Sequence, residues 1–337
     1  MRAAALLLAA AVPLACGDAG SGAGRDAADQ PLRPDPGPPP TLVEGPLIDH
    51  VDPFIATGGV GFGVGSALPG ATAPFGLVKV SPDTTSPNGR PGWSHCAGYA
   101  YGDPLIVGFT HTHMHGTGVP DYGNILFLPA AVEPGGRPPA RDEAVPYDKA
   151  SEAAAAGYYA VTLDDGTRVE LTASSRAAVH RYTFPEGTEE LLLVDVLAAI
   201  PDGRVPESDL DLRPADRLVE GWAHNDGPIT QRSGGLSVFF SASFNRPFYP
   251  HPDEPTVLRF QPGEGPVVVH VGLSFVDLEG ARRNREAEVE GRDFDEVRAA
   301  TEASWEAELG RIRVAGVACR AVRLLQLGRI RRRKRLC

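Results

Sequence analysis

The chain has 337 residues, including 39 glycines and 32 prolines, and a formal net charge of −11 at pH 7. Eight basic and no acidic residues lie beyond position 316, so the rest carries 24 Lys and Arg against 43 Asp and Glu, a charge of −19. Because such a surface repels phosphate, this part of the chain is excluded as a partner for nucleic acid or anionic membranes. The four cysteines form no CxxC pair, which excludes a zinc site built from thiolates.

Residues 1–16 have the pattern of a signal peptide. One arginine precedes an apolar run over 3–14 that is too short to span a bilayer, and the segment ends in Leu14-Ala15-Cys16. A cysteine after a small residue indicates bacterial lipoprotein processing, with Cys16 as the lipidated new N-terminus, although Pro13 stands where this pattern usually has leucine. We therefore expect export, either as a cell-envelope lipoprotein or as a secreted bacterial protein.

Residues 17–44 consist largely of Gly, Ala, Asp and Pro and predict a disordered tether. The ordered β body is expected over 45–280. Its glycine-rich run at 57–65 is no phosphate loop, because GK[ST] is missing and Pro69 and Pro74 block a following helix. A glycine-lined approach for a ligand, or tight packing of strands, accounts for this run better.

The segment over 81–102 is predicted to be a loop that presents Trp93, His95, Tyr99 and Tyr101. Aromatic side chains on loops commonly stack on the C–H faces of sugars, so this segment indicates a carbohydrate platform. The alternative is that Trp93 fills the core of the domain.

The segment over 108–129 places His111, His113 and His115 at a spacing of two. On an extended strand this spacing sends the three imidazoles to one face, beside a glycine turn that holds Asp121. Two interpretations stay open: a polar ligand site, in which the histidines contact sugar hydroxyls, bind a transition metal or form contacts between domains, and a hydrogen-bonded structural cluster. Asp83, Asp103 and Asp121 are the candidate carboxylates near it.

Beyond residue 157 the hydrophobic pattern alternates with period two between turn signals, which predicts antiparallel strands. The sequence Asp164-Asp165-Gly166 predicts a hairpin turn. The expected fold is mainly β, a large antiparallel β-sandwich of the supersandwich type. The predicted strands are 158–163, 167–173, 176–184, 191–196, 236–244 and 267–275.

Residues 281–316 predict linker helices and a short strand. The segment over 281–289 is weakly helical, and Asp293 with Glu296 forms a capping-box pattern that begins a helix ending near Leu309. Residues 312–314 predict one more strand. The tail over 317–337 then turns abruptly basic and is expected to be solvated and unfolded.

Five stretches of the sequence resemble glycoside hydrolase family 92, the calcium-dependent exo-α-mannosidases. They follow the order of the family, and the first two are long and specific. The stretches are VDPFIATGGVGFGVGSALPGATAPFGLVKVSPDT (51–84), GFTHTHMHGTGVPDYGNILFLP (108–129), HRYTFP (180–185), FNRPF (244–248) and ARRNREAEVEGRDFDEVRAATEASWEAELGRIRV (281–314).

The resemblance implies a two-part enzyme, with an N-terminal β-sandwich joined by helices to an α/α toroid. It also implies removal of α-linked mannose from N-glycans or mannans with inversion, which needs one carboxylic acid and one carboxylate. In the family these carboxylates and most calcium ligands belong to the toroid, so neither catalytic residues nor a metal ion are expected in this chain alone. The sequence leaves the family pattern after residue 316, as a truncated gene, a frameshift or an assembly error would cause.

The expected role is thus one wall of a mannoside pocket, with the absent toroid as its packing partner. Trp93 would stack on the sugar, while His95, His113, His115 and Asp121 would shape the wall. The alternative is a non-catalytic carbohydrate-binding module on a tether. Without the toroid, Phe294, Trp305 and Leu309 are expected to form an exposed apolar patch that causes aggregation.

Overall fold

The computed structural model describes residues 45–58, 66–89, 94–141, 143–201 and 203–312. The predicted signal peptide with Cys16, the basic tail, most of the glycine-rich run and Trp93 lie outside these ranges. The predictions made for them are therefore not compared with structure below.

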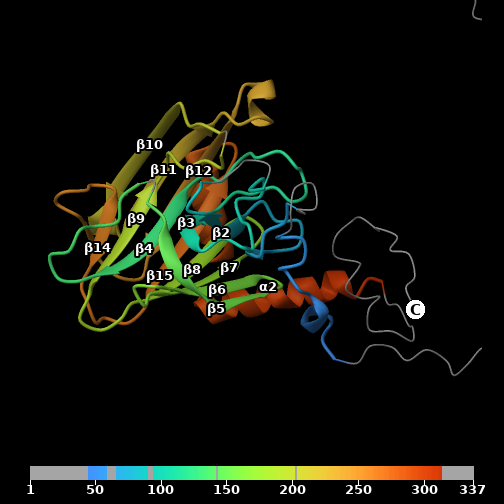
Figure 1. Cartoon of the computed structure of the whole chain (residues 1–337), viewed down its shortest axis with the longest axis horizontal. Coiled ribbons are helices and arrows are strands. Elements are labelled where there is room, and N and C mark those ends of the chain that lie inside the picture. Colours follow the sequence, from blue (N-terminus) through green and yellow to red (C-terminus); the bar gives the residue numbers. More distant parts are fainter. Residues whose placement is uncertain (1–44, 59–65, 90–93, 142, 202, 313–337) are drawn as a thin grey trace, which may run out of the picture. The chain divides into compact units, whose positions relative to one another are not determined.

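Strands dominate the described chain (Figure 1). The strands are β1 (Ala71–Thr72), β2 (Lys79–Thr85), β3 (Leu105–Thr110), β4 (Leu126–Val132), β5 (Val145–Ala155), β6 (Tyr158–Leu163), β7 (Arg168–Ala173), β8 (Ala177–Thr183), β9 (Glu189–Asp195), β10 (Glu207–Arg213), β11 (Leu218–Asn225), β12 (Leu236–Phe244), β13 (Phe248–Pro250), β14 (Val257–Phe260) and β15 (Val267–Ser274). The helices are η1 (Leu47–His50), η3 (Pro214–Asp216), η4 (Thr230–Ser233), α1 (Leu278–Glu288) and α2 (Phe294–Leu309).

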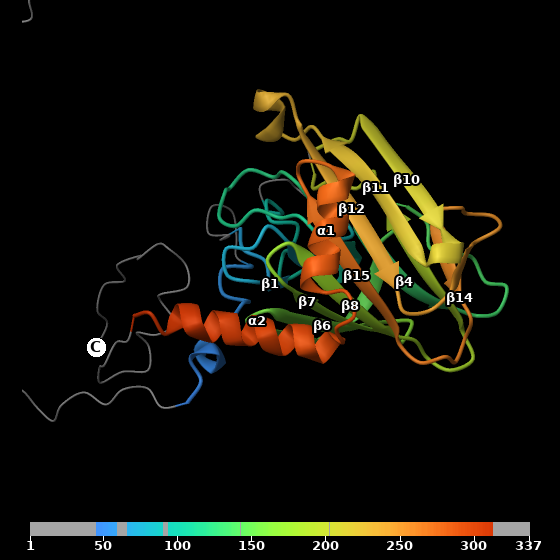
Figure 2. The ribbon, with the colours of Figure 1, turned by 180° about the vertical axis from the view of Figure 1, so that it is seen from behind.

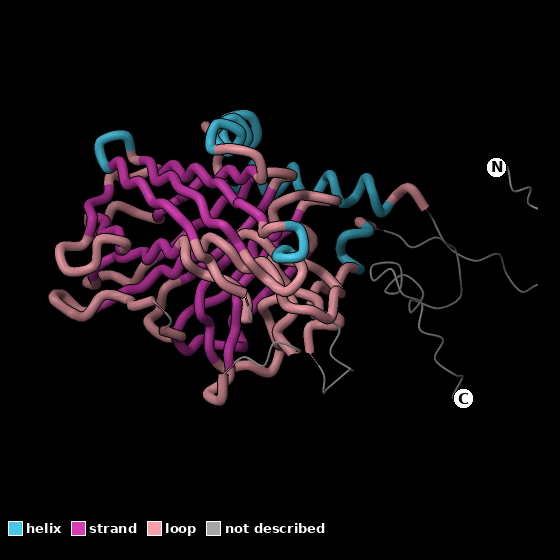
Figure 3. The backbone as a smooth tube through the Cα atoms, turned by 90° about the horizontal axis from the view of Figure 1, so that it is seen from above, coloured by secondary structure: helices cyan, strands magenta, loops and turns pink. Residues whose placement is uncertain are grey.

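The strands pair antiparallel in two layers that β5 joins. One layer has the order β10-β11-β12-β15-β8-β7-β6-β5, and the other has β3-β4-β9-β14-β13, with β2 beside β3 and β1 beside β2. The crossing layers are seen from above in Figure 3, with the helices at the edges of the strands. The predicted mainly β, antiparallel sandwich fold is confirmed.

The core lies between the two layers. Phe127 of β4 meets Phe240 of β12 edge to face, with ring centroids 6.3 Å apart, and both side chains are fully buried. This contact joins strands from different layers, so the alternating apolar residues of both layers fill one interior. At the outer edge, β10 exposes Glu207, Asp209 and Asp211 in alternation, which discourages pairing with another chain.

The predicted hairpin at residues 164–166 joins β6 to β7, closed by a hydrogen bond from the Leu163 N–H to the Thr167 carbonyl at 2.9 Å. The other predicted strands correspond to β8, β9, β12 and β15 within one or two residues at each end. Strands β5, β10 and β11 were not predicted, because their apolar residues, such as Leu210 and Val219, are few and stand among polar residues and alanines. Of the strand predicted over 312–314, only exposed Ile312 is described.

Helices α1 and α2 pack on the outside of the larger layer (Figure 2). Helix α1 lies over β12 and β15, where Arg282 of α1 binds Glu220 of β11 at 2.6 Å. Helix α2 begins with the predicted capping box, since Glu296 N–H donates to Asp293 at 2.7 Å and Asp293 N–H donates to Glu296 at 3.2 Å. No described helix combines the length and the apolarity needed to cross a membrane.

The prediction of an exposed apolar patch on α2 is wrong, since neither Phe294 nor Trp305 is exposed and Leu309 is partly buried. The predicted aggregation stays a prediction. Phe294 is only 2% exposed and packs with Tyr158 of β6 in a second, smaller core between helix and sheet. Trp305 is half-buried, and its indole Nε1–H donates to the Thr72 carbonyl at 2.6 Å. These apolar residues face the sandwich itself, so α2 is part of this domain.

Candidate functional site

The three histidines of the 108–129 segment do not share a face. Strand β3 ends at Thr110, and the chain beyond it turns, so the spacing of two no longer corresponds to a strand. His111 points into the core, His113 lies under the neighbouring loops, and His115 is exposed. The prediction that one strand face presents all three imidazoles is therefore wrong.

His113 is held in a closed cluster with Asp83 and Thr110. Its Nε2 lies 2.9 Å from Asp83 Oδ1, and its Nδ1 lies 2.7 Å from the Lys79 carbonyl oxygen. The Thr110 hydroxyl donates to the other oxygen of Asp83 at 2.8 Å. The His113 ring thus has acceptors at both nitrogens, and all three side chains of the cluster are buried.

Strand β2 brings Asp83 to this cluster through a bulge. The register with β3 shifts between Asp83 and Thr84, which breaks the alternation of faces and turns both side chains toward the loops. Gly98, at φ +81°, covers Asp83 so closely that a Cβ would lie 1.9 Å from Oδ1. A glycine is required there for both reasons.

His95 forms a second pair. Its Nε2 lies 2.6 Å from Asp103 Oδ2, and Ser94 Oγ lies 2.8 Å from its Nδ1. Asp103 also accepts a hydrogen bond from the Thr84 hydroxyl at 2.8 Å. His95 is 2% exposed and Asp103 is 9% exposed, so this pair supports the loop from below rather than presenting a free imidazole to a ligand.

His111 belongs to a chain of hydrogen bonds in the core. Its Nδ1 lies 2.6 Å from the Ile125 carbonyl oxygen and must donate to it, so its Nε2 accepts from His180 Nε2 at 2.9 Å. His180 Nδ1 then accepts from the Tyr182 hydroxyl at 2.7 Å. Burial lowers the pKa of His111 to about 4 and the pKa of His180 well below its ordinary value, so both rings are neutral.

Asp121 is fully buried inside a loop cluster. Its carboxylate accepts hydrogen bonds from the N–H groups of Ile229 and Thr230 at 2.7 and 2.8 Å and from Asn225 Nδ2 at 2.6 Å. Gly227 leaves room for it, since a Cβ there would lie 2.2 Å from Oδ1. This carboxylate holds the start of η4, and a role for it in binding sugar stays a prediction.

Lys79 and His115 form the open side of this region. Lys79 is partly buried, and this burial lowers the pKa of its ammonium. His115 is exposed on the glycine turn, where the Gly116 N–H donates to the Ser66 carbonyl at 2.7 Å. Of the predicted sugar-binding residues that the structure describes, His115 alone is exposed, and its role too stays a prediction.

A polar hollow of about 200 Å³ lies beside the His113 cluster and is lined by Asp83, Arg141 and Asp195 among others. Arg141 Nε lies 3.2 Å from Asp195 Oδ2, and the Leu197 N–H donates to Asp195 Oδ1 at 2.8 Å. The two carboxylates of this hollow are therefore each engaged by other groups of the chain.

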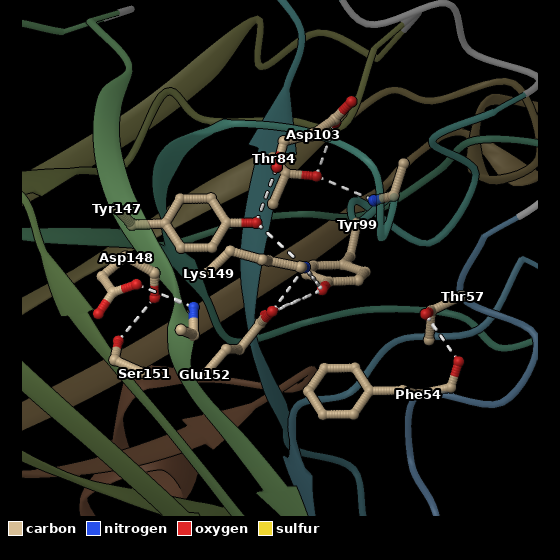
Figure 4. A network of polar contacts seen from close by, with 12 residues as sticks. Phe54, Thr57, Thr84, Tyr99, Asp103, Tyr147, Asp148, Lys149, Ser151 and Glu152 are labelled. Carbon is tan, nitrogen blue, oxygen red and sulfur yellow. Dashed lines mark hydrogen bonds and ion pairs between the residues drawn. The ribbon is translucent and has the colours of Figure 1, made fainter.

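A second, open hollow of about 460 Å³ lies beside Tyr101. Behind it, β5 carries a network around Glu152, whose carboxylate binds Lys149 at 2.6 Å and accepts a hydrogen bond from Tyr99 (Figure 4). The same carboxylate accepts a hydrogen bond from Tyr159 at 2.7 Å. This network was not predicted from the sequence. Tyr99 lies 53 residues from Glu152 in the chain, and only the aromatic character of the 81–102 loop indicated a site there.

Comparison with known proteins identifies the family. Residues 50–251 match the profile of the glycosyl hydrolase family 92 N-terminal domain. The chain belongs to glycosyl hydrolase family 92. The family predicted from the sequence motifs is thus confirmed.

Relatives of this family 92 chain are much longer. An uncharacterized secreted glycosidase of Arthroderma benhamiae is 29% identical over 311 residues, which cover 80% of this chain and 39% of that protein. The structure of the family GH92 α-mannosidase BT3965 from Bacteroides thetaiotaomicron is 30% identical, with a TM-score of 0.68 over 79% of this chain and 38% of that chain. The inverting mannosidase BT2199 from B. thetaiotaomicron VPI-5482 is 26% identical, with a TM-score of 0.67, over 82% of this chain and 38% of that one. The chain thus spans about two fifths of the length of these relatives.

The calcium that the family resemblance implied needs six to eight oxygen ligands in one place. In the part of this family 92 chain that the structure describes, no three His, Cys, Asp or Glu side chains gather as a metal site. The described residues therefore show no cluster of carboxylates for this ion, and the calcium of the family stays a prediction for this chain.

Proposed function

We propose that this family 92 chain forms the N-terminal wall of an α-mannosidase-type glycoside hydrolase that acts on α-mannosides of N-glycans or mannans. Membership of the family and 30% identity to an α-mannosidase support this substrate class. The secreted relative agrees with an exported protein, and Cys16 would tether the domain to the cell envelope.

The hydrogen bonds of the candidate carboxylates support the proposal that this wall of the pocket does not supply the catalytic acid and base. Inverting hydrolysis needs two carboxyl groups about 6.5–9.5 Å apart, with room between them for the sugar and a water. Asp83, Asp103 and Asp121 each accept hydrogen bonds from neighbouring protein groups, and Asp121 has no exposed surface. The acid, the base and the calcium would then come from the part of the family's length that this chain does not span.

The direct test is hydrolysis of 4-nitrophenyl α-mannoside by the purified chain, with and without calcium, beside the B. thetaiotaomicron α-mannosidase. We expect no turnover above the blank for this chain. Calcium-dependent turnover at the level of the relative would contradict the missing acid and base. A chimera in which residues 45–312 replace the matching part of the relative tests the wall itself, and we expect it to regain activity.

The second candidate is a non-catalytic carbohydrate-binding module, which the hollow beside the half-exposed Tyr101 favours. It predicts tight glycan binding by the chain alone. Calorimetry with mannobiose separates the two: heat with a micromolar dissociation constant supports the module, and weak or absent heat supports the wall, because one wall buries too little of a ligand.

A further inference from the structure

Tyr101 is a half-exposed aromatic side chain at the edge of an open hollow. Its side chain keeps 50% of its surface exposed, and it lines the hollow of about 460 Å³ with Asp52 and Phe54. This volume lies within the range of about 300–1,000 Å³ that small-molecule sites occupy. A half-exposed ring at a hollow of this size is a candidate contact for a ligand.

The ring of Tyr101 is held in place by the neighbouring segment over 54–58. The Tyr101 N–H donates to the Thr57 carbonyl at 3.0 Å, and Phe54 meets the ring edge to face at a centroid distance of 5.7 Å. A Cβ on Gly58 would lie 3.0 Å from the Tyr101 Cβ, so the two segments approach closely. The ring therefore loses little conformational freedom when a ligand packs on it.

An ion pair between the partly exposed Lys149 and the buried Glu152 supports the ring from behind. The register of β5 with β6 shifts between Asp148 and Ala153, and this bulge contains Lys149 and Glu152. The Lys149 ammonium lies 4.1 Å from the centroid of the Tyr101 ring, a cation–π contact.

The donors of Lys149 are already used within the protein. Its ammonium binds Glu152 at 2.6 Å, the Tyr99 hydroxyl at 2.6 Å and the Tyr147 hydroxyl at 3.3 Å, as Figure 4 shows. The Glu152 side chain is 2% exposed. Lys149 is thus a fixed cation that holds the Tyr101 ring in place. The groups left to contact a ligand are the aromatic rings and Asp52.

We propose that the Tyr101 ring, bounded by the Phe54 ring that stands at 75° to it, forms an aromatic shelf on which a hexopyranose unit of a glycan stacks, with Asp52 accepting a hydrogen bond from one of its hydroxyls. The choice of a sugar rests on the proposed function. Apolar C–H faces of a pyranose suit an aromatic ring, and its hydroxyls suit a carboxylate that donates nothing. Asp52 uses Oδ1 to accept from the Phe54 N–H at 3.1 Å and retains acceptor capacity. An anionic ligand is disfavoured by this carboxylate and by the net charge of −11.

Saturation-transfer NMR on the full chain tests the shelf, with methyl α-mannoside, methyl α-glucoside and methyl β-galactoside as probes. We expect binding of at least one probe, with a dissociation constant on the order of 1 mM. Tyr101→Ala should weaken it about tenfold, and Tyr101→Phe should retain it. Tyr249→Ala is the matched control, because Tyr249 is 61% exposed on β13 and does not line the hollow.

The outcomes separate the shelf from the proposed function. Mannoside binding that Tyr101→Ala leaves unchanged, in a variant with the thermal transition of the wild type, overturns the shelf and leaves the mannosidase proposal standing. Binding of glucoside or galactoside alone, lost in Tyr101→Ala, supports the shelf and contradicts the mannoside assignment. A wild-type chain that binds none of the three probes overturns the shelf.

Discussion

His180 Nε2 lies 2.9 Å from His111 Nε2 in the fully buried interior between the two layers of the sandwich. Two nitrogens at this distance share one proton, so protonation of His111 would place two N–H groups face to face. Protonation of His180 would turn its Nδ1, which accepts from the Tyr182 hydroxyl, into a donor. The carbonyl of Ile125, which sits at an unusual φ of +59°, and the Tyr182 hydroxyl complete the chain. The pair joins β8 to the segment after β3 and requires neutral imidazoles.

This pair predicts a loss of stability in acid. Unfolded histidine binds a proton below about pH 6.5, whereas burial lowers the pKa of His111 in the folded protein to about 4. The unfolded state therefore binds more protons across this window, and the free energy of unfolding should fall by about 2 kcal/mol through His111 as pH drops from 7.5 to 5. The lowered pKa of His180 acts in the same direction. Urea denaturation at pH 7.5 and pH 5 measures it.

Replacing one member of the pair should change both the stability and its pH dependence. His180→Phe leaves His111 Nε2 and the Tyr182 hydroxyl without their partner, so we expect a loss of about 2–4 kcal/mol at pH 7.5 and a flatter pH dependence. His50→Gln is the control, because His50 lies in η1 and contacts neither member of the pair, and it should keep the wild-type slope. An unchanged slope in His180→Phe would contradict the assignment.

Substitution of Asp121 tests whether this carboxylate has a structural or a sugar-binding role. Asp121→Ala removes the acceptor for two backbone N–H groups, of Ile229 and Thr230, and for the Asn225 amide. We expect the free energy of unfolding to fall by about 2–4 kcal/mol, because buried donors lose their partner. Asp209→Asn, on the exposed edge strand β10, should change it by less than about 0.5 kcal/mol. Full stability of Asp121→Ala would return Asp121 to the candidates for ligand binding.

Alanine substitutions at Gly98 and Gly89 separate the cost of backbone strain at positive φ from the cost of a steric clash. Both have φ near +85°, but a Cβ on Gly98 would meet Asp83 Oδ1 at 1.9 Å, while a Cβ on Gly89 would meet nothing within 4 Å. Gly89→Ala should cost about 1 kcal/mol, the price of the backbone conformation alone. Gly98→Ala should cost at least 2 kcal/mol more, because it displaces Asp83 from His113. If thermal denaturation showed the same loss of stability for Gly89→Ala and Gly98→Ala, the Asp83 cluster would accommodate the added methyl group without cost.

The sequence predicted those parts of the fold whose signal is local. The β6–β7 hairpin, the strand β12 and the capping box of α2 each depend on residues within a few positions of one another. Strand β5 was missed because its bulge and its Ala-rich end carry no alternation, although it joins the two layers. Its buried Glu152 has a charged partner three residues away, Lys149, but also a tyrosine partner from a distant loop, Tyr99.

The candidate site was predicted only in part, because the sequence shows which residues are near one another in the chain but not how they lie in space. The sequence indicated that Asp83, Asp103 and Asp121 lie near the polar cluster, and the structure places Asp83 on His113 and Asp103 on His95. It could not show where β3 ends. Because the chain turns after Thr110, the three imidazoles diverge, and a period-two pattern at a strand end gives no warning of this.

Substitution of Phe294 tests whether α2 stabilises this domain or provides an apolar face for another domain. Its ring is 2% exposed, packs on Tyr158 and lies 4.2 Å from the Arg181 guanidinium carbon. Phe294→Ala should therefore lower the free energy of unfolding of the chain itself by about 3–5 kcal/mol. Val276→Ala is the control, since Val276 is 80% exposed, and it should cost less than about 0.5 kcal/mol. If Phe294→Ala instead left the unfolding transition unchanged in urea, the helix would contribute nothing to this domain, and its apolar face would have to serve a partner.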